Sequence, residues 1–286
     1  MDDAAMAPTV ERSELVAFED LVRAAAGTAA QPLVRCWRQG ADGLVVQAPS
    51  LPMTLFNRVF GLGLQAGPDD ALLADLAARQ GGERSPRFAV QPAPGALGDA
   101  WRARLQALGW QPRLQSLVQM ARDLVRYPQA ALPPAPGLTV REAGADEAER
   151  FAATAVAGFG MPPWFVPWLA RLPGRAGWHC LVAERDGRPV GAAALFVQRL
   201  PGGDGDGDIG GIGWLGIAAT LREHRGLGVQ RSLMQARLAL ATRLGCRVAT
   251  TETGAPESGQ PHPSYSNMLG CGFRQVALRT SWAPPV

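Results

Sequence analysis

The stretch TLREHRGLGVQR, residues 220–231, joins an apolar, strand-like segment to a helix with one apolar face. Its two glycines, Gly226 and Gly228, let a ligand approach the backbone closely because they carry no Cβ. The first turn of a helix also offers unpaired N–H groups and the positive end of the helix dipole. Arg225 and Arg231 add positive charge. The pattern predicts a binding site for a phosphate or pyrophosphate group.

A tight strand-to-helix turn is the alternative interpretation, because a Gly-x-Gly pair alone is weak evidence. The dinucleotide-binding fingerprint and the P-loop do not fit, since the stretch has no Gly-x-Gly-x-x-Gly and the chain has no lysine. The segment 214–219 before the stretch is typical of a buried strand. The helix after it repeats apolar residues three or four positions apart, at Val229, Leu233, Ala236, Leu240 and Leu244. The loop therefore opens a packed helix.

The stretch resembles the acetyl-CoA-binding motif of the GNAT superfamily of N-acetyltransferases, Gln/Arg-x-x-Gly-x-Gly/Ala. It stands here as Arg225-Gly226-Leu227-Gly228-Val229-Gln230, with Gln230 in place of the last small residue. The resemblance implies that main-chain groups of Ala218, Ala219 and Thr220 bind the pantetheine arm and acetyl carbonyl of acetyl-CoA. It also implies that Gly226 to Arg231 hold the pyrophosphate, with Arg225 and Arg231 as charge partners.

Length and composition favour two domains in a cytoplasmic protein. The chain has 286 residues, 47% of them hydrophobic, and a net charge of +3 carried by arginine as its only strongly basic residue. It lacks a basic stripe interleaved with aromatic residues, so nucleic acid is not an expected partner. It also lacks an apolar run long enough to span a membrane. Its four cysteines and three histidines are scattered, and we expect no metal.

The proline-rich segment 128–137, PQAALPPAPG, is expected to be a stiff linker between domains of residues 1–127 and 138–286. The second half reads as a succession of strands and helices that resembles the GNAT fold over about residues 138–282. That fold is a mixed, mostly antiparallel sheet flanked by helices, and the cofactor enters where neighbouring strands splay apart. We therefore expect an α/β chain with such a domain at its C-terminus.

The first half repeats this order in a degenerate form. Residues 105–112, LQALGWQP, parallel residues 267–274, NMLGCGFR, and the strands and helices upstream of both segments also correspond. Where the glycine loop is expected, residues 61–70, GLGLQAGPDD, contain glycines and two carboxylates but no arginine. Acidic side chains there would repel a pyrophosphate. We predict a tandem GNAT protein whose N-terminal copy does not bind the cofactor productively.

Acetyl transfer to an amine requires a held thioester, a neutral amine close to its carbonyl and a proton for the departing thiolate. Glu252, on the strand beside the cofactor strand, is the predicted general base; an outward-facing carboxylate and a water relay are alternatives. Glu223 is expected at the surface. In the family's last motif Met268 replaces the tyrosine that usually protonates the thiolate, and a thioether cannot donate a proton. Tyr265, one turn earlier, or solvent is expected to serve instead.

Several other features of the sequence allow two interpretations of their role. Ser264 either caps the following helix or contacts the cofactor, and Asn267 is placed to bond the pantetheine amide. The aromatic segment 159–172 either lines the acceptor site or packs in the core. Asp204, Asp206 and Asp208 resemble the start of a calcium loop but lack its turn glycine, so a hairpin loop is the better interpretation.

The predicted function is transfer of an acetyl group from acetyl-CoA to a primary amine of a small molecule or peptide. The acceptor and the oligomeric state are left open. The alternative is an acyl-CoA-binding or regulatory protein without turnover. It is favoured by two departures from the family's last motif, Met268 in place of the tyrosine and Pro261 in place of the asparagine.

Overall fold

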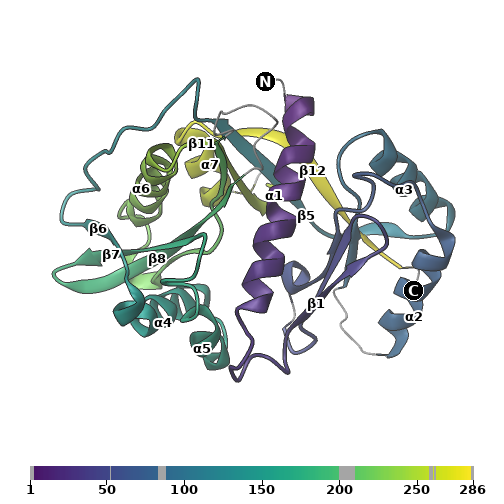
Figure 1. The fold of residues 1–286 in the computed structure, drawn as a ribbon, viewed down its shortest axis with the longest axis horizontal. Helices are drawn as coiled ribbons and strands as arrows, with labels where there is room; N and C mark the ends of the chain where they lie inside the picture. Colours follow the sequence, from purple (N-terminus) through teal and green to yellow (C-terminus); the bar gives the residue numbers. More distant parts are fainter. Residues whose placement is uncertain are drawn as a thin grey trace.

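The computed structural model describes residues 3–51, 53–82, 88–199, 210–257, 260 and 262–284. Within these ranges the strands form one sheet in the order β1-β2-β3-β4-β12-β5-β11-β9-β8-β7-β6, and the short β10 pairs with β8. Neighbouring strands are antiparallel except for β3 with β4 and β9 with β11. Helices flank the sheet (Figure 1). The predicted fold class, a mixed and mostly antiparallel sheet flanked by helices, is confirmed.

The first half of the chain contributes one long helix, two shorter helices and five strands. In order they are α1 (Asp3–Arg23), β1 (Arg35–Gln39), β2 (Gly43–Gln47), the 3-10 helix η1 (Thr54–Phe56), β3 (Asn57–Phe60), α2 (Asp70–Gly82), β4 (Ala89–Gln91), α3 (Ala96–Ala107) and β5 (Gln111–Asp123). The sequence analysis does not predict the hairpin that β1 and β2 form. The charged sequence of β1 lacks a regular apolar alternation, so no strand pattern marks it.

The second half begins with β6 (Thr139–Glu142), α4 (Ala148–Phe159), the 3-10 helix η3 (Pro163–Phe165), α5 (Val166–Leu169), β7 (Trp178–Arg185) and β8 (Arg188–Arg199). It continues with β9 (Gly211–Trp214), β10 (Ala218–Thr220), the 3-10 helix η4 (Arg222–His224), α6 (Val229–Arg243), β11 (Cys246–Gly254), α7 (Pro263–Gly270) and β12 (Arg274–Ala283). The loop with Asp204, Asp206 and Asp208 lies outside the described residues. A tight turn joins β7 and β8, and Asp186 and Gly187 in it both have positive φ.

Strands β5 and β12 are exchanged between the halves of the chain. The last strand, β12, lies between β4 and β5, and β5 lies between β12 and β11. Figure 1 shows these two long strands running side by side beneath α1 from one half of the molecule to the other. Residues of the two halves therefore alternate across the middle of one sheet. The limits 1–127 and 138–286 for two domains stay a prediction.

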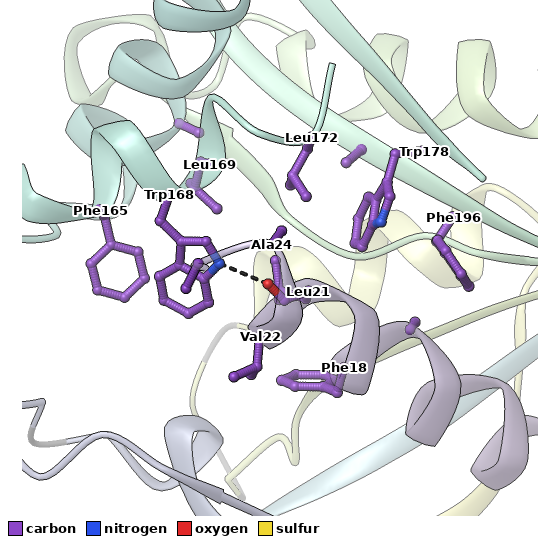
Figure 2. Packing of buried hydrophobic residues seen from close by; sticks show 14 of the residues in the cluster. Phe18, Leu21, Val22, Ala24, Phe165, Trp168, Leu169, Leu172, Trp178 and Phe196 are labelled. Atoms are coloured by element: carbon purple, nitrogen blue, oxygen red, sulfur yellow. Dashed lines mark hydrogen bonds between the residues drawn. The ribbon is translucent and has the colours of Figure 1, made fainter. Parts of the chain in front are cut away.

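Helix α1 belongs to the first half of the chain but packs into the core of the second. The Phe18 ring meets Phe60 of β3 and Trp214 of β9 edge to face, at centroid distances of 5.7 and 5.5 Å. The indole N–H of Trp168 in α5 donates to the carbonyl oxygen of Leu21 at 2.7 Å (Figure 2). Phe165 and Trp168 of the aromatic segment thus pack in the core, whereas Phe159 is exposed, and α1 joins the halves.

The proline-rich segment runs along α6. The backbone N–H of Gln129 donates to the hydroxyl of Thr242 at 3.2 Å, and that of Ala135 donates to the hydroxyl of Ser232 at 3.0 Å. This contact brings the end of the segment close to the start of α6, where an added Cβ on Gly228 would lie 2.9 Å from the Cβ of Ala135. The segment is thus anchored at both of its ends.

Candidate functional site

The sheet opens between β9 and β11. The last bonds that join the two chain segments are made by Leu215, whose N–H donates to the Thr250 carbonyl at 2.7 Å and whose carbonyl accepts from the Thr251 hydroxyl at 2.9 Å. Ile217 then adopts a φ of +44°, a strained conformation for a β-branched residue. Beyond it β10 pairs with β8 alone. The strands therefore splay apart, and β11 faces the gap.

Arg237 of α6 lies beneath this opening. One guanidinium nitrogen, Nη1, donates to the carbonyls of Ala194 and Gly216 at 3.0 and 3.1 Å, and Nε donates to the carbonyl of Leu233. Burial lowers the pKa of Arg237 to about 9. Arg237 thus gives the Gly216 carbonyl a hydrogen-bond partner at the point where the pairing of β9 with β11 ends. This contact stabilises the open form of the sheet.

The glycine loop has the geometry that the sequence predicts. Gly226 and Gly228 both have a φ of +79°, and α6 starts directly after Gly228. The N–H groups of the first helical turn have no partner within the helix. Arg225 is exposed and donates to the carbonyl of Gly158 at 3.1 Å, while Arg231 is exposed in the first turn. Neither forms an ion pair with a carboxylate in the described part of the chain, so both charges remain available to an anion.

The side chain of Gln230 connects the first turn of α6 to α7. Its amide accepts from Asn267 Nδ2 at 2.7 Å and donates to the hydroxyl of Ser264 at 3.3 Å. The cap of α7 comes from His262, whose Nδ1 accepts from the N–H of Tyr265. Capping by Ser264 is therefore wrong, because Ser264 lies within the first turn and bonds to Gln230 instead.

A cavity of about 1050 Å³ occupies the opening and extends toward the first half of the chain. One end is lined by residues 215–218 at the junction of β9 and β10, by residues 251–254 of β11, and by Gln230, Met234, Arg237, Ser264 and Met268. The other end is lined by α1, by residues 53–56 and by the aromatic segment between α4 and α5. This volume is at the upper limit of ligand cavities, which span about 300–1000 Å³.

Glu252 faces this cavity and is nearly buried, with 8% of its side chain exposed. Its two oxygens are held by arginines of both halves: Oε1 accepts from Arg58 Nη2 at 3.0 Å, and Oε2 accepts from Arg279 Nη1 at 2.7 Å. Arg58 and Arg279 also bind Glu14 of α1, at 2.8 Å each, and Arg279 binds Glu11. The result is a buried cluster of three carboxylates and two guanidinium groups.

Two carboxylates of this cluster, Glu14 and Glu252, have very different pKa values. Burial raises the pKa of Glu252 to about 7, helped by the negative charge of Glu14 and opposed by Arg58 and Arg279. Burial also disfavours ionisation of Glu14, but Arg279 and Arg58 outweigh it and lower the pKa of that carboxyl to about 2. Because the cluster has one more carboxylate than guanidinium groups, one carboxyl keeps its proton most easily, and it is the one facing the cavity.

Tyr265 and Met268 occupy different positions relative to the cavity. Met268 and Ser264 are among its lining residues, whereas Tyr265 is not, and the Tyr265 hydroxyl donates to Gln275 at 3.3 Å. The thioether of Met268 therefore lies where the family tyrosine is expected. This placement favours solvent as the proton source, and the role of Tyr265 as an acid stays a prediction.

Four charged residues of the cluster are missing from the sequence prediction: Glu11, Glu14, Arg58 and Arg279. They come from α1, β3 and β12, and the exchange of strands brings them together. One signal was available, because Arg58 lies among the apolar residues Phe56, Val59 and Phe60, and a charged residue in such a position requires a partner.

The counterpart of the glycine loop in the first half is closed. The N–H of Ala93 donates to the Leu62 carbonyl at 2.8 Å, so the segments after β3 and β4 remain joined. The backbone N–H groups of Gln65 and Ala66 donate to Asp42 Oδ2 at 2.7 and 2.9 Å. The Asp42 carboxylate thus accepts the N–H groups of this loop that could otherwise bind an anion.

Two negative findings concern metals and membranes. Within the described residues, no group of three or more His, Cys, Asp and Glu side chains has a geometry that could hold a metal ion. None of the described helices combines the length and apolarity that crossing a lipid bilayer requires.

Comparison with known sequences gives one family. Residues 148–259 match the model of the acetyltransferase (GNAT) family. No curated protein sequence matches the chain significantly. The family match covers the opening of the sheet, the glycine loop, α6 and β11.

Comparison with solved structures extends the similarity to the whole chain. A GCN5-related N-acetyltransferase from Sphaerobacter thermophilus matches with a TM-score of 0.57 and 20% identity, covering 98% of this chain and 92% of that one. One from Kribbella flavida matches at 0.56 and 15%, covering 98% and 96%. A tandem GNAT protein from the clavulanic acid biosynthesis pathway matches at 0.55 and 16%, covering 93% and 89%. At these identities the matches show the fold.

Proposed function

We propose that this chain, which belongs to the GNAT superfamily, transfers an acetyl group from acetyl-CoA to a primary amine. The observation that carries the proposal is a single cavity that runs from the first turn of α6 through the open sheet to Glu252. A glycine loop with free positive charge lies at one end of this path, and a carboxylate with a pKa of about 7 lies within it. An anion site and an opened strand can hold the thioester, and a carboxylate within the cavity can take the proton of the amine.

The residues present fit acetyl-CoA. The N–H groups of Gly226 to Arg231 and the charges of Arg225 and Arg231 suit a pyrophosphate. Main-chain groups of the splayed strand, at Ala218, Ala219 and Thr220, suit the amide groups of a pantetheine arm. Leu227 and Val229 complete the loop, and Gln230, Ser264 and Asn267 form a polar group beside it. We assign these residues to cofactor binding.

Glu252 is the proposed general base. In the reaction the amine nitrogen forms a bond to the acetyl carbon, the thioester C–S bond breaks, and its electron pair stays on sulfur. The nitrogen loses one proton to Glu252, directly or through water, and the thiolate gains one from solvent or from Tyr265. A carboxyl with a pKa of about 7 is half ionised at neutral pH, which suits a group that takes a proton and returns it.

We further propose a division of labour between the halves. Residues 138–286 bind acetyl-CoA, and residues 1–127 supply α1, β3 and β5 to the acceptor side of the site. The described cysteines are all free thiols, and burial raises the pKa of Cys180, so its thiol is unreactive. We infer a reducing, cytoplasmic location for the reaction.

An acyl-CoA-binding or regulatory protein without turnover is the second candidate, and the placement of Met268 in the cavity lining favours it. One experiment separates the two functions. Release of free CoA thiol and the mass of the N-acetyl product are measured over a panel of amines, alongside calorimetric binding of acetyl-CoA. The proposal expects both binding and amine-dependent release; binding without release on every amine would support the second candidate.

A further inference from the structure

The cavity has one polar end and one apolar end. At the polar end are the splayed backbone, Gln230 and Arg237. At the apolar end the lining consists of Phe18 and Leu21 of α1, residues 53–56, Phe159, Met161, Phe165, Trp168 and Leu169. Acetyl-CoA, if bound as proposed, accounts for the polar end. The apolar end has no role in the chemistry described so far.

The walls of the apolar end are packed and rigid. The Phe56 ring contacts Phe165 and Trp168 at centroid distances of 5.6 and 5.7 Å. Phe18 and Phe165 are each 2% exposed and Trp168 is fully buried. The indole N–H of Trp168 is already bonded to Leu21, so it is not free for a ligand (Figure 2). Apart from the Thr54 side chain and the methionine thioethers, a ligand in this space meets aromatic and aliphatic carbon.

Charge at this end disfavours a polycationic acceptor. Of the described residues that line the cavity, Glu252 is the one carboxylate, and Arg58 and Arg279 already neutralise it. Arg237 adds a positive charge at the polar end. A molecule with several ammonium groups would lose their hydration without gaining opposite charges in return.

We propose that the acceptor is a primary amine on an aromatic or bulky aliphatic body, held between α1, the 53–56 segment and α5. This inference rests on the proposed acetyl transfer and names its substrate class. The apolar body fills the aromatic end, and the amine points back toward Glu252 and the thioester. The N-terminal half therefore contributes half of the acceptor site, which gives the exchanged arrangement of the chain a function.

The first test compares amines with different bodies at equal acetyl-CoA. 2-Phenylethylamine and hexylamine are compared with ethanolamine and spermidine, with release of CoA thiol and product mass as readouts. Because the phenyl ring of 2-phenylethylamine can bury apolar area that ethanolamine lacks, its kcat/KM is expected to exceed that of ethanolamine at least tenfold. Equal values, or a preference for spermidine, would overturn the proposal.

A pair of matched variants localises the effect. Leu55→Asp places a carboxylate in the cavity wall at a half-buried residue, while Leu97→Asp makes the same change on α3 at a residue 40% exposed and outside the lining. Leu55→Asp is expected to lower kcat/KM for 2-phenylethylamine at least tenfold and to raise it for spermidine. Leu97→Asp is expected to change neither. Equal behaviour of both folded variants would count against the inference.

Two further outcomes separate this inference from the proposed function. If hexanoyl-CoA is used more efficiently than acetyl-CoA and competes with 2-phenylethylamine, the apolar end is an acyl pocket and the inference is wrong. If no amine releases thiol, acetyl transfer fails, yet calorimetry of 2-phenylethylamine with the acetyl-CoA-bound protein still tests the apolar end. Binding that Leu55→Asp abolishes would support the site, and the absence of binding would overturn it.

Discussion

Arg58 of β3 and Glu252 of β11 are 194 residues apart in sequence and form a two-bonded ion pair, Nη2 to Oε1 at 3.0 Å and Nη1 to Oε2 at 3.3 Å. The Arg58 guanidinium also lies over the rings of Phe18 and Phe60, at 4.6 and 4.3 Å from their centroids. An arginine of the first half thus holds the proposed base of the second. The electrostatics of the site depend on both halves.

Replacing Arg58 by methionine is expected to destabilise the whole chain. The change leaves Glu14 and Glu252 buried with one guanidinium fewer, and removing one partner of such a cluster costs about 3–5 kcal/mol. Urea unfolding measures the loss. The matched control is Arg104→Met, which removes a surface ion pair with Asp70 and is expected to leave the midpoint unchanged. Equal urea midpoints for Arg58→Met and the control would contradict the claim that Arg58 stabilises the buried cluster.

Glu252→Gln is expected to lower kcat at least 100-fold while the Kd of acetyl-CoA stays within twofold, because a general base contributes about 10²–10⁴ to the rate. The wild-type kcat/KM should rise with pH up to about 7, where Glu252 ionises, and this limb should vanish in the variant. Assays of CoA thiol release over pH 5.5–9 measure the loss of kcat and the pH dependence of kcat/KM. Glu223→Gln, a change at an exposed residue beside the glycine loop, is the control. Full activity of Glu252→Gln would rule out its role as base.

The stability of the fold should depend on pH in two opposite ways. The folded pKa of Glu14, about 2, is below its unfolded value, so the chain gains stability from this group as pH rises from about 2 to 4.5. The folded pKa of Glu252, about 7, is above its unfolded value. The stability from this group is complete below about pH 4.5 and is lost as pH rises through 7. The stability of Glu252→Gln relative to wild type should therefore be higher at pH 7.5 than at pH 4.5. Urea unfolding midpoints of both proteins at the two pH values measure this change. The same difference between the proteins at both pH values would contradict the prediction.

Sequence predicts the glycine loop well because its function is local. Gly226, Gly228 and Arg231 are neighbours in the chain, and a helix start fixes their geometry regardless of what surrounds it. The position of Glu252 is predictable for a similar reason, since it lies near the end of β11, the strand that directly follows α6 and pairs with β9. Local backbone geometry that neighbouring residues determine can therefore be predicted from the sequence.

The ion cluster could not be predicted in this way. Arg279 meets Glu11 and Glu14 only because β12 inserts between β4 and β5, and no local pattern encodes which strand of the sheet lies beside which. The same exchange places α1 over the centre of the sheet and makes it a wall of the cavity. Non-local pairing therefore determines the ion cluster and the end of the cavity that α1 lines, while local pattern determines the glycine loop.

Arg231→Ala is expected to weaken acetyl-CoA binding about fivefold to tenfold with little change in kcat. A charge-assisted bond to a phosphate contributes about 1–1.4 kcal/mol, and Arg231 is exposed in the first turn of α6, where no carboxylate of the described chain pairs with it. Calorimetry at low and high salt measures the effect, which should shrink as salt rises. Arg243→Ala, in the last turn of the same helix, is the control and should bind like wild type.

The chain is expected to bind one molecule of acetyl-CoA. In the first half an added Cβ on Gly63 would lie 2.7 Å from the backbone nitrogen of Gly98, so α3 packs directly on the loop that corresponds to the glycine loop. Asp42 already accepts two N–H groups of that loop, and a second pyrophosphate would have to displace this carboxylate and meet its charge. Native mass spectrometry with excess acetyl-CoA should therefore give one ligand per chain, and Arg231→Ala should weaken that single binding event. Asp42→Asn should leave the stoichiometry at one, because the closed β3–β4 pairing remains. Two ligands bound per wild-type chain would show that the first half is a working cofactor site.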